Sequence, residues 1–268
     1  MADRTAVSGA TRVFAILGDP VAQVGSPAAF NRLFAAIGVD AVMVALQVPA
    51  DELAGAVVGL RAIRNLDGLV LTIPHKIAMA GLVDELAPNG RLVGAVNAVR
   101  CQADGRWLGD MFDGAGCVNA LARSGHRLRG RHVLQVGAGG VGRAIAFAFA
   151  GQGVARLTIN DVAAERAAGL ARAVAAAFPA VEAATGPARV HGHDTVVNCT
   201  PLGMAAGDPP PVPVADLAPG MLVIDVVLLA VPTPLLAAAA ARGCLTQTGR
   251  QMLDGQVTEI ARFFGLGA

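Results

Sequence analysis

Two separated segments of the sequence hold groups that can take part in chemistry. Lys76 ends the run Thr72–Lys76, and Asp113 follows further along the chain. An ammonium group and a carboxylate can together move a proton to or from a hydroxyl group. The second segment, Gly137–Gly142, is a glycine-rich loop of the kind that holds the phosphates of a dinucleotide. Together the two segments predict an oxidoreductase that uses a nicotinamide cofactor.

The glycine-rich loop gains specificity from its surroundings. It follows an apolar strand expected at 133–136 and opens an apolar helix. In that context Gly137 permits a tight turn, Gly139 lets a pyrophosphate approach the backbone, and Gly142 permits close contact between helix and strand. Glycine clusters also make ordinary turns, but the strand before this loop and the helix after it favour a dinucleotide site.

Asp161 bears on the choice of cofactor. It follows the next expected strand, 24 positions after Gly137, where a ribose-binding acid is expected. A carboxylate there would repel a 2′-phosphate, so the sequence favours NAD over NADP. Asp161 can also cap the helix that begins near Ala163, and the two roles are compatible. Arg166 is close in sequence and would favour NADP if its side chain turned back towards the ribose.

Two series of alternating strands and helices position these groups. Strand–helix alternation of this kind predicts mostly parallel sheets covered by helices. The first series has strands at 13–17, 41–48 and 69–72, helices from 26 and at 51–63, and a hairpin of 96–100 with 106–109. The second has strands at 132–136, 156–159, 195–198 and 222–225, with helices at 141–150, 163–178 and 234–242.

The two series predict an α/β protein of two domains. We expect a mostly parallel substrate-binding domain at 12–113 and a Rossmann-type dinucleotide-binding domain at 114–242. A helix near 113–124 should connect them. The segment 243–268, with a helix at 252–264, is expected to return to the first domain.

Composition excludes several classes of function. The net charge is +1, and the chain has no tyrosine and one tryptophan, so neither a basic surface nor stacking aromatics for nucleic acid are expected. No stretch reaches the roughly 20 apolar residues of a membrane span. The polar residues 1–12 lack the apolar core of a signal peptide. We therefore expect a cytoplasmic protein without nucleic-acid or membrane partners.

A metal site is not expected either. Cys101, Cys117, Cys199 and Cys244 have no CxxC spacing and are interpreted as reduced, buried side chains. His191 and His193 form an HxH pair without a nearby third ligand, which favours a solvated loop over a zinc site.

The wider pattern resembles the shikimate/quinate dehydrogenase family. The matches run in order from about residue 13 to 256. They are Gly18–Ala22, Ser26-Pro27, Thr72–Lys76, Gly94–Asn97, Gly109-Asp110, Asp113-Gly114, the GAGG loop, Asn198–Met204, Gly249, Met252-Leu253 and Gln256.

The resemblance implies roles for individual residues. Lys76 and Asp113 would be the acid–base pair, and Ser26, Thr72, Asn97 and Gln256 would contact substrate. Lys76 as an ammonium can donate its proton to a developing alkoxide, and Asp113 could serve mainly to position the lysine. The implied cofactor contacts are Gly137, Ala138, Gly139, Gly140, Val141, Gly142, Asn160, Asp161, Asn198, Thr200, Pro201 and Met204.

Several positions depart from the family pattern. The family's S-x-S-P reads Val24-Gly25-Ser26-Pro27, and its N-V-T-x-P-x-K begins with Val70. Met111-Phe112 replaces Asn-Thr in D-N-T-D-G, Leu228 replaces a tyrosine, and Phe30 replaces a histidine. Each change removes a hydrogen-bonding group, so we expect shikimate to be a poor substrate. A register error of one residue at Val24 or Leu228 is the alternative.

The leading hypothesis is reversible hydride transfer between a nicotinamide and a cyclic hydroxy acid or its ketone, by a monomer or homodimer. One alternative is a genuine shikimate or quinate dehydrogenase in which waters replace the lost contacts. The other is a dinucleotide-binding or regulatory module without turnover, which the intact Lys76 and Asp113 argue against.

Overall fold

The computed structural model describes residues 7–267, so part of the polar N-terminal segment, residues 1–6, lies outside the described range. Within this range the chain forms two compact units. Unit 1 comprises residues 7–112 and 256–267, and unit 2 comprises residues 113–255. The predicted α/β class and the return of the C-terminal helix to the first unit are confirmed. The assignment of substrate binding to 12–113 and of dinucleotide binding to 114–242 stays a prediction.

Unit 1 is built on a mixed sheet with the strand order β2-β1-β3-β5-β6-β4. The three strands of the βαβαβ series are parallel to one another, with β1 in the middle. The hairpin strands follow antiparallel to β3, and the short β4 joins β6 in parallel. The strands are β1 (Arg12–Gly18), β2 (Ala41–Gln47), β3 (Leu66–Leu71), β4 (Glu85–Leu86), β5 (Ala98–Cys101) and β6 (Trp107–Asp110).

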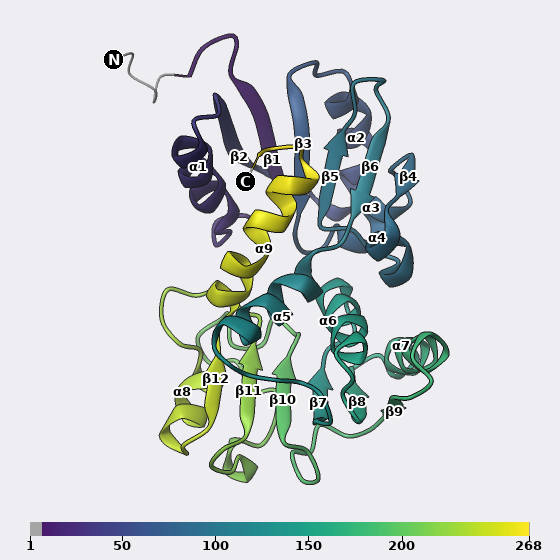
Figure 1. The fold of residues 1–268 in the computed structure, drawn as a ribbon, viewed down its shortest axis with the longest axis vertical. Helices are drawn as coiled ribbons and strands as arrows, with labels where there is room; N and C mark the ends of the chain where they lie inside the picture. The colour runs from purple at the N-terminus through teal and green to yellow at the C-terminus, as the bar shows by residue number, and fades with distance from the viewer. Residues whose placement is uncertain (1–6, 268) are drawn as a thin grey trace. The chain divides into compact units, whose positions relative to one another are not determined.

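Apolar side chains bury both faces of this sheet. On one face, α1 (Ser26–Ile37) and the end of α9 (Gly249–Phe263) meet the strands around Phe14 (Figure 1). The Phe14 ring lies 5.2 Å from that of Phe34 and 5.0 Å from that of Phe264, centroid to centroid. On the other face, α2 (Leu53–Arg61) and α3 (Lys76–Ala80) cover the remaining side chains of β1 and β3. The segment η1 (Ala50–Glu52) precedes α2, and α4 (Pro88–Val93) precedes β5.

Unit 2 is a wholly parallel sheet in the order β12-β11-β10-β7-β8-β9. The order reverses between β7 and β10, and ligands of such sheets bind beyond the carboxyl ends of the strands at this reversal. The strands are β7 (His132–Val136), β8 (Arg156–Asn160), β9 (Glu182–Thr185), β10 (Thr195–Asn198), β11 (Leu222–Asp225) and β12 (Leu245–Gln247). The helices are α5 (Asp113–Arg123), α6 (Gly140–Gly151), α7 (Ala164–Ala177), η2 (Val214–Asp216) and α8 (Pro234–Ala241).

Several short elements were missed by the sequence patterns. The helices α3 and α4 and the strands β4, β9 and β12 are two to six residues long, which is too short to show a hydrophobic period. The strand β9 (EAAT) is mostly exposed, and its pairing with β8 through the backbone defines it. None of the helices in the described chain is long and apolar enough to span a membrane.

A glycine lets α5 approach α6 closely within unit 2. A Cβ on Gly114 would lie 2.5 Å from the Ala144 carbonyl oxygen and 2.7 Å from the Ala148 Cβ. Backbone atoms of a packed helix cannot move aside cheaply, so any side chain here would separate the two helices.

We predict that Gly114→Ala lowers the free energy of unfolding by about 1–3 kcal/mol, because the added methyl overpacks the helix contact. The matched control is Gly169→Ala in α7, where no heavy atom lies within 4 Å of the added Cβ. That change should stabilise unit 2 by about 0.5–1 kcal/mol. Urea denaturation measures both, and equal effects of the two substitutions would contradict the packing argument.

Candidate functional site

Backbone hydrogen bonds hold the segments that carry Thr72, Lys76 and Asn97 together beyond the carboxyl end of β3. Thr72 follows β3, and the Leu71 amide beside it donates to the Asn97 carbonyl at 2.8 Å. Lys76 opens α3, and its carbonyl accepts the Val96 amide at 2.8 Å. The segment that ends in Lys76 is therefore fixed against the segment that carries Asn97.

Buried His75 anchors the lysine from the other side. Its ring is 1% exposed and donates from Nε2 to the Val48 carbonyl at 2.8 Å. Its backbone carbonyl accepts the amide of Met79. The start of α3 is thus tied to the chain just beyond β2, a role for His75 that the sequence analysis did not predict.

Asn97 and Gln256 form a buried amide pair. The Asn97 Oδ1 accepts the Phe112 amide at 2.8 Å, and its Nδ2 donates to the Gln256 Oε1 at 2.8 Å. Because the Gln256 oxygen is taken, its Nε2 group remains to donate to a ligand. The pair therefore joins two predicted substrate residues and orients the second as a hydrogen-bond donor.

Three of the residues that depart from the family pattern belong to the core of unit 1 or pack against it. Phe30 and Val70 are buried in the cluster around Phe14, and Val24 packs against it. Ser26, 6% exposed, is the first residue of α1. No side-chain hydrogen bond caps that helix, so the serine hydroxyl is not committed to capping.

The other predicted catalytic residue, Asp113, is the first residue of unit 2 and of α5. It is 2% exposed. The preceding residue, Phe112, is held by Asn97 through its amide. The chain therefore leaves unit 1 at a point fixed by a predicted substrate residue.

The glycine-rich loop of unit 2 has the geometry of a dinucleotide cradle. Gly137 has φ 104°, and a Cβ on Gly142 would lie 2.2 Å from the Gly137 carbonyl oxygen. At Gly139, by contrast, no heavy atom lies within 4 Å of the position that a Cβ would take. The loop is therefore tightly closed where helix meets strand and open where a pyrophosphate would approach, next to the first amides of α6.

Gln135 braces this loop and was not recognised from the sequence. Its side chain is fully buried in β7, and Nε2 donates to the carbonyls of Gly137 and Gly142, each at 2.9 Å. The Oε1 atom has no partner among the described residues. A polar residue inside an otherwise apolar strand was the available signal.

Asp161 lies at the predicted place, but its carboxylate is engaged by the protein. It accepts the Ala138 amide at 2.7 Å, the Ala163 amide at 2.8 Å and the Arg166 Nη2 at 2.8 Å. Burial raises the pKa of Asp161, but the three donors outweigh it and hold that pKa below its usual value. Arg166 does turn back to Asp161, and its side chain remains 56% exposed.

The remaining predicted cofactor residues differ in how their polar atoms are used. The Asn160 side chain donates to the Gly186 carbonyl at 2.9 Å. Asn198 is fully buried, and its amide bonds to Asp225, Leu202 and Thr200. The neighbouring turn brings the Met204 amide to the Pro201 carbonyl at 3.0 Å, and Ala138, Gly140 and Val141 lie in the glycine-rich loop or at the start of α6.

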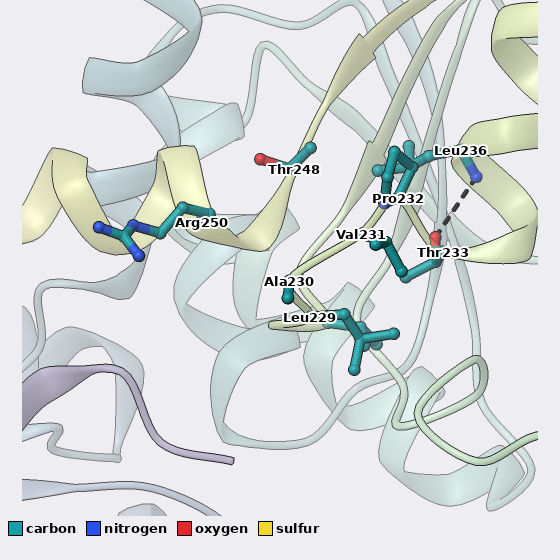
Figure 2. A pocket seen from close by; sticks show the side chains of 9 residues that line it. Leu229, Ala230, Val231, Pro232, Thr233, Leu236, Thr248 and Arg250 are labelled. Atoms are coloured by element: carbon teal, nitrogen blue, oxygen red, sulfur yellow. Dashed lines mark hydrogen bonds between the residues drawn. The ribbon is translucent and has the colours of Figure 1, made fainter.

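A pocket of about 190 Å³ lies beyond the carboxyl ends of β11 and β12 (Figure 2). Sequence reasoning did not predict it. Its apolar wall comes from the loop after β11, and Thr233 and Thr248 supply hydroxyl groups. Figure 2 shows the Arg250 guanidinium pointing away from that loop, and it pairs with Asp254 at 3.0 Å. The lining residues are Val227, Leu229, Ala230, Val231, Pro232, Thr233, Leu236, Thr248 and Arg250.

The described residues contain no group of three His, Cys, Asp or Glu side chains placed to hold a metal ion. His193 of the HxH pair instead contacts the Thr158 hydroxyl at 2.8 Å, and burial lowers the pKa of its ring. The four cysteines are free thiols, and burial raises the pKa of Cys117 to about 12.

Comparison with known proteins identifies relatives that span both units. Residues 16–99 match the family model described as "Shikimate dehydrogenase substrate binding domain". A curated relative from Symbiobacterium thermophilum, named "Shikimate dehydrogenase (NADP(+))", is 40% identical over 263 residues, covering 94% of this chain and 88% of the relative. The chain belongs to the shikimate dehydrogenase family. It is an NAD(P)-dependent oxidoreductase, as predicted.

Solved structures agree over almost the whole length. A shikimate dehydrogenase crystallised with NADP+ superimposes with a TM-score of 0.88 at 28% identity, covering 97% of this chain and 91% of that one. The ligand-free 5-ketofructose reductase of Gluconobacter sp. strain CHM43 superimposes with a TM-score of 0.81 at 29% identity, covering 96% and 94%.

The predicted preference for NAD is wrong. Four curated relatives that are 34–40% identical to this chain carry NADP(+) in their names. The prediction rested on the negative charge of Asp161, which would repel a 2′-phosphate unless Arg166 turned back towards the ribose. In the structure, two backbone amides and the Arg166 guanidinium already bind that carboxylate, so its negative charge is offset.

We predict that Asn97→Ala destabilises unit 1, because the Phe112 amide and the Gln256 Oε1 each lose a buried partner. The free energy of unfolding should fall by about 1–3 kcal/mol for each buried group left unpaired. Asn97→Asp, which keeps an acceptor for Phe112, should cost less. Urea denaturation compares the two variants, and an equal loss would contradict the importance of the Phe112 hydrogen bond.

Proposed function

We propose that this chain is an NADP-dependent dehydrogenase that reversibly oxidises a shikimate-like cyclic hydroxy acid. The observation that carries the proposal is Lys76. It is the only lysine among the 268 residues, in a chain whose other 20 basic residues are all arginine. Arginine stays protonated in proteins, whereas lysine can release its proton near neutral pH when its surroundings lower its pKa. The single side-chain amine of the chain therefore lies in the segment Thr72–Lys76, where the proposed proton transfer takes place.

The residues around Lys76 suit such a reaction. The bound nicotinamide supplies the acceptor or donor of the hydride. Lys76 takes or gives the proton at the substrate oxygen, and Asp113 takes part in the same acid–base step. Thr72 and Asn97 lie on segments hydrogen-bonded to their neighbours, and Gln256 offers Nε2 as a donor. These side chains would orient the ring so that its carbinol carbon faces the hydride acceptor.

The cofactor contacts of unit 2 support NADP. The open cradle at Gly139 and the start of α6 would hold the pyrophosphate. Arg166 keeps an exposed guanidinium beside Asp161, where a 2′-phosphate would lie. Asp161 would fix this arginine and the Ala138 amide rather than read the ribose hydroxyls. Asn160, Asn198, Thr200, Pro201 and Met204 stay predictions as direct contacts.

The carboxylate of a shikimate-like substrate would meet one serine hydroxyl in this chain instead of two. Ser26 is the remaining hydroxyl of the family's two-serine motif, because Val24 packs against the core. A carboxylate held by one hydroxyl should bind less tightly, which raises KM for shikimate.

The second candidate is a polyol or ketose without a carboxylate. The observation that favours it is the apolar Val24, and the likeness to a 5-ketofructose reductase is consistent with it. A cytoplasmic location and a monomeric or homodimeric state stay predictions.

We predict that the purified protein oxidises shikimate with NADP+ and that Lys76→Ala lowers kcat about 10²–10⁴-fold, the usual cost of losing an acid–base group. Lys76→Arg keeps the positive charge but should not restore turnover, because a guanidinium does not exchange its proton. Dissociation constants for NADP+ should stay close to wild type in both variants.

Three outcomes decide between the functions. A kcat/KM for shikimate of about 10⁴ M⁻¹s⁻¹ or above supports a genuine shikimate dehydrogenase and contradicts a weakened carboxylate contact. Turnover of 5-ketofructose but not of shikimate supports the second candidate. Wild-type activity in Lys76→Ala on the better substrate removes Lys76 from the mechanism.

We further predict that Arg166→Ala weakens NADP+ binding at least about tenfold, since a charged hydrogen bond to the 2′-phosphate is lost. Binding of NAD+ should change much less. Arg172→Ala, at an exposed position later in α7, is the control and should leave both affinities unchanged. Calorimetric titration of both cofactors measures this, and an equal loss for NAD+ and NADP+ would remove Arg166 from phosphate recognition.

A further inference from the structure

The carboxylate of Asp225 is a buried acidic group that the reaction itself does not use. Asp225 is the last residue of β11, and its side chain is fully buried. Its Oδ1 accepts the Asn198 Nδ2 at 3.0 Å and the Val227 amide at 3.1 Å. Its Oδ2 accepts the Thr233 hydroxyl at 2.6 Å. Three separate segments therefore donate to one carboxylate.

Two of these donors, Asn198 and Thr233, make further hydrogen bonds to other segments. The Asn198 Oδ1 accepts both the amide and the hydroxyl of Thr200, at 3.0 and 2.6 Å, and its Nδ2 also donates to the Leu202 carbonyl at 3.0 Å. The Thr233 Oγ1 accepts the Leu236 amide at 3.3 Å and so caps α8 (Figure 2). Asp225 thus joins the loop after β10, the loop after β11 and the start of α8.

Two of these segments, the loop after β11 and the start of α8, line the pocket beyond β11. Val227, Thr233 and Leu236 all line it, and each is bonded to Asp225 directly or through one atom. The strand order reverses between β7 and β10, and a dinucleotide lies across such a reversal. Its adenosine half belongs with the glycine-rich loop and Asp161, next to β7 and β8. Its nicotinamide half then falls on the loops after β10 and β11.

The charge on Asp225 matters for this arrangement. Burial raises its pKa, and the hydrogen bonds from Thr233, Val227 and Asn198 oppose that rise. All three contacts are donors, so an ionised carboxylate satisfies every one of them. An amide in its place would turn an N–H₂ group towards the Thr233 hydroxyl and would force that hydroxyl to find another acceptor.

We propose that Asp225 is a positioning residue that shapes the binding site of the nicotinamide half of the cofactor. This inference rests on the proposed NADP-dependent function. Asp225 does not touch the cofactor. It sets the loop after β11 and, through Asn198, the loop after β10, so the pocket has its bound shape before the nicotinamide enters.

The test separates the two halves of the cofactor. The probes are NADPH and 2′-phospho-ADP-ribose, which lacks only the nicotinamide, each titrated by calorimetry. In Asp225→Asn, NADPH should lose at least about tenfold in affinity, while 2′-phospho-ADP-ribose binds as to wild type. Thr233→Val, which removes one donor at nearly constant volume, should give the same pattern if Asp225→Asn fails to fold.

Asp194→Asn is the matched control. Asp194 immediately precedes β10 at its amino end and accepts the His132 amide at 3.1 Å and the Thr195 hydroxyl at 2.7 Å. Its loss should lower stability without changing the ratio of the two affinities. Equal weakening of both probes in Asp225→Asn, or no weakening of either, overturns the positioning role. Failure of the wild type to bind either probe overturns the proposed cofactor as well.

Discussion

Buried polar groups at the ends of the strands must find hydrogen-bond partners inside the protein, and this requirement shapes both units. An unpaired buried donor or acceptor costs about 1–3 kcal/mol, a large part of the stability of a small domain. Asn97 meets the requirement by bonding to Phe112 and Gln256, and Asp225 by bonding to three segments at once. The loops that carry the chemistry are fixed as a consequence.

The same requirement separates residues that bind ligands from residues that position them. Asn198 uses both ends of its amide within the protein, and Asp161 accepts two backbone amides and one arginine. Neither is a free recognition group of the kind that its place in the sequence suggested. In contrast, Gln256 keeps its donor group and Arg166 keeps an exposed guanidinium. Under the proposed function, Gln256 and Arg166 would therefore bind the ligands, while Asn97 and Asp161 hold these two side chains in place.

The apolar departures from the family pattern have a different consequence. Phe30 and Val70 extend the core of unit 1, and Val24 packs against it. Side chains that would present hydroxyl, imidazole or amide groups in the family here bury apolar surface, which stabilises the unit but removes hydrogen bonds from the expected pocket. Lys76, the proposed catalytic residue, remains on a helix whose start is anchored by His75.

The sequence by itself determined the two α/β series, the glycine-rich loop and the place of Lys76 in its motif, because hydrophobic period and glycine spacing are local properties. It did not determine the edge strand β9, which backbone pairing with β8 defines. It also gave the wrong cofactor, since the charge at Asp161 depends on Arg166 and on the Ala138 amide, which is 23 residues away in sequence. Only the tertiary structure decided these features, because which polar group faces which partner is fixed when distant segments pack together.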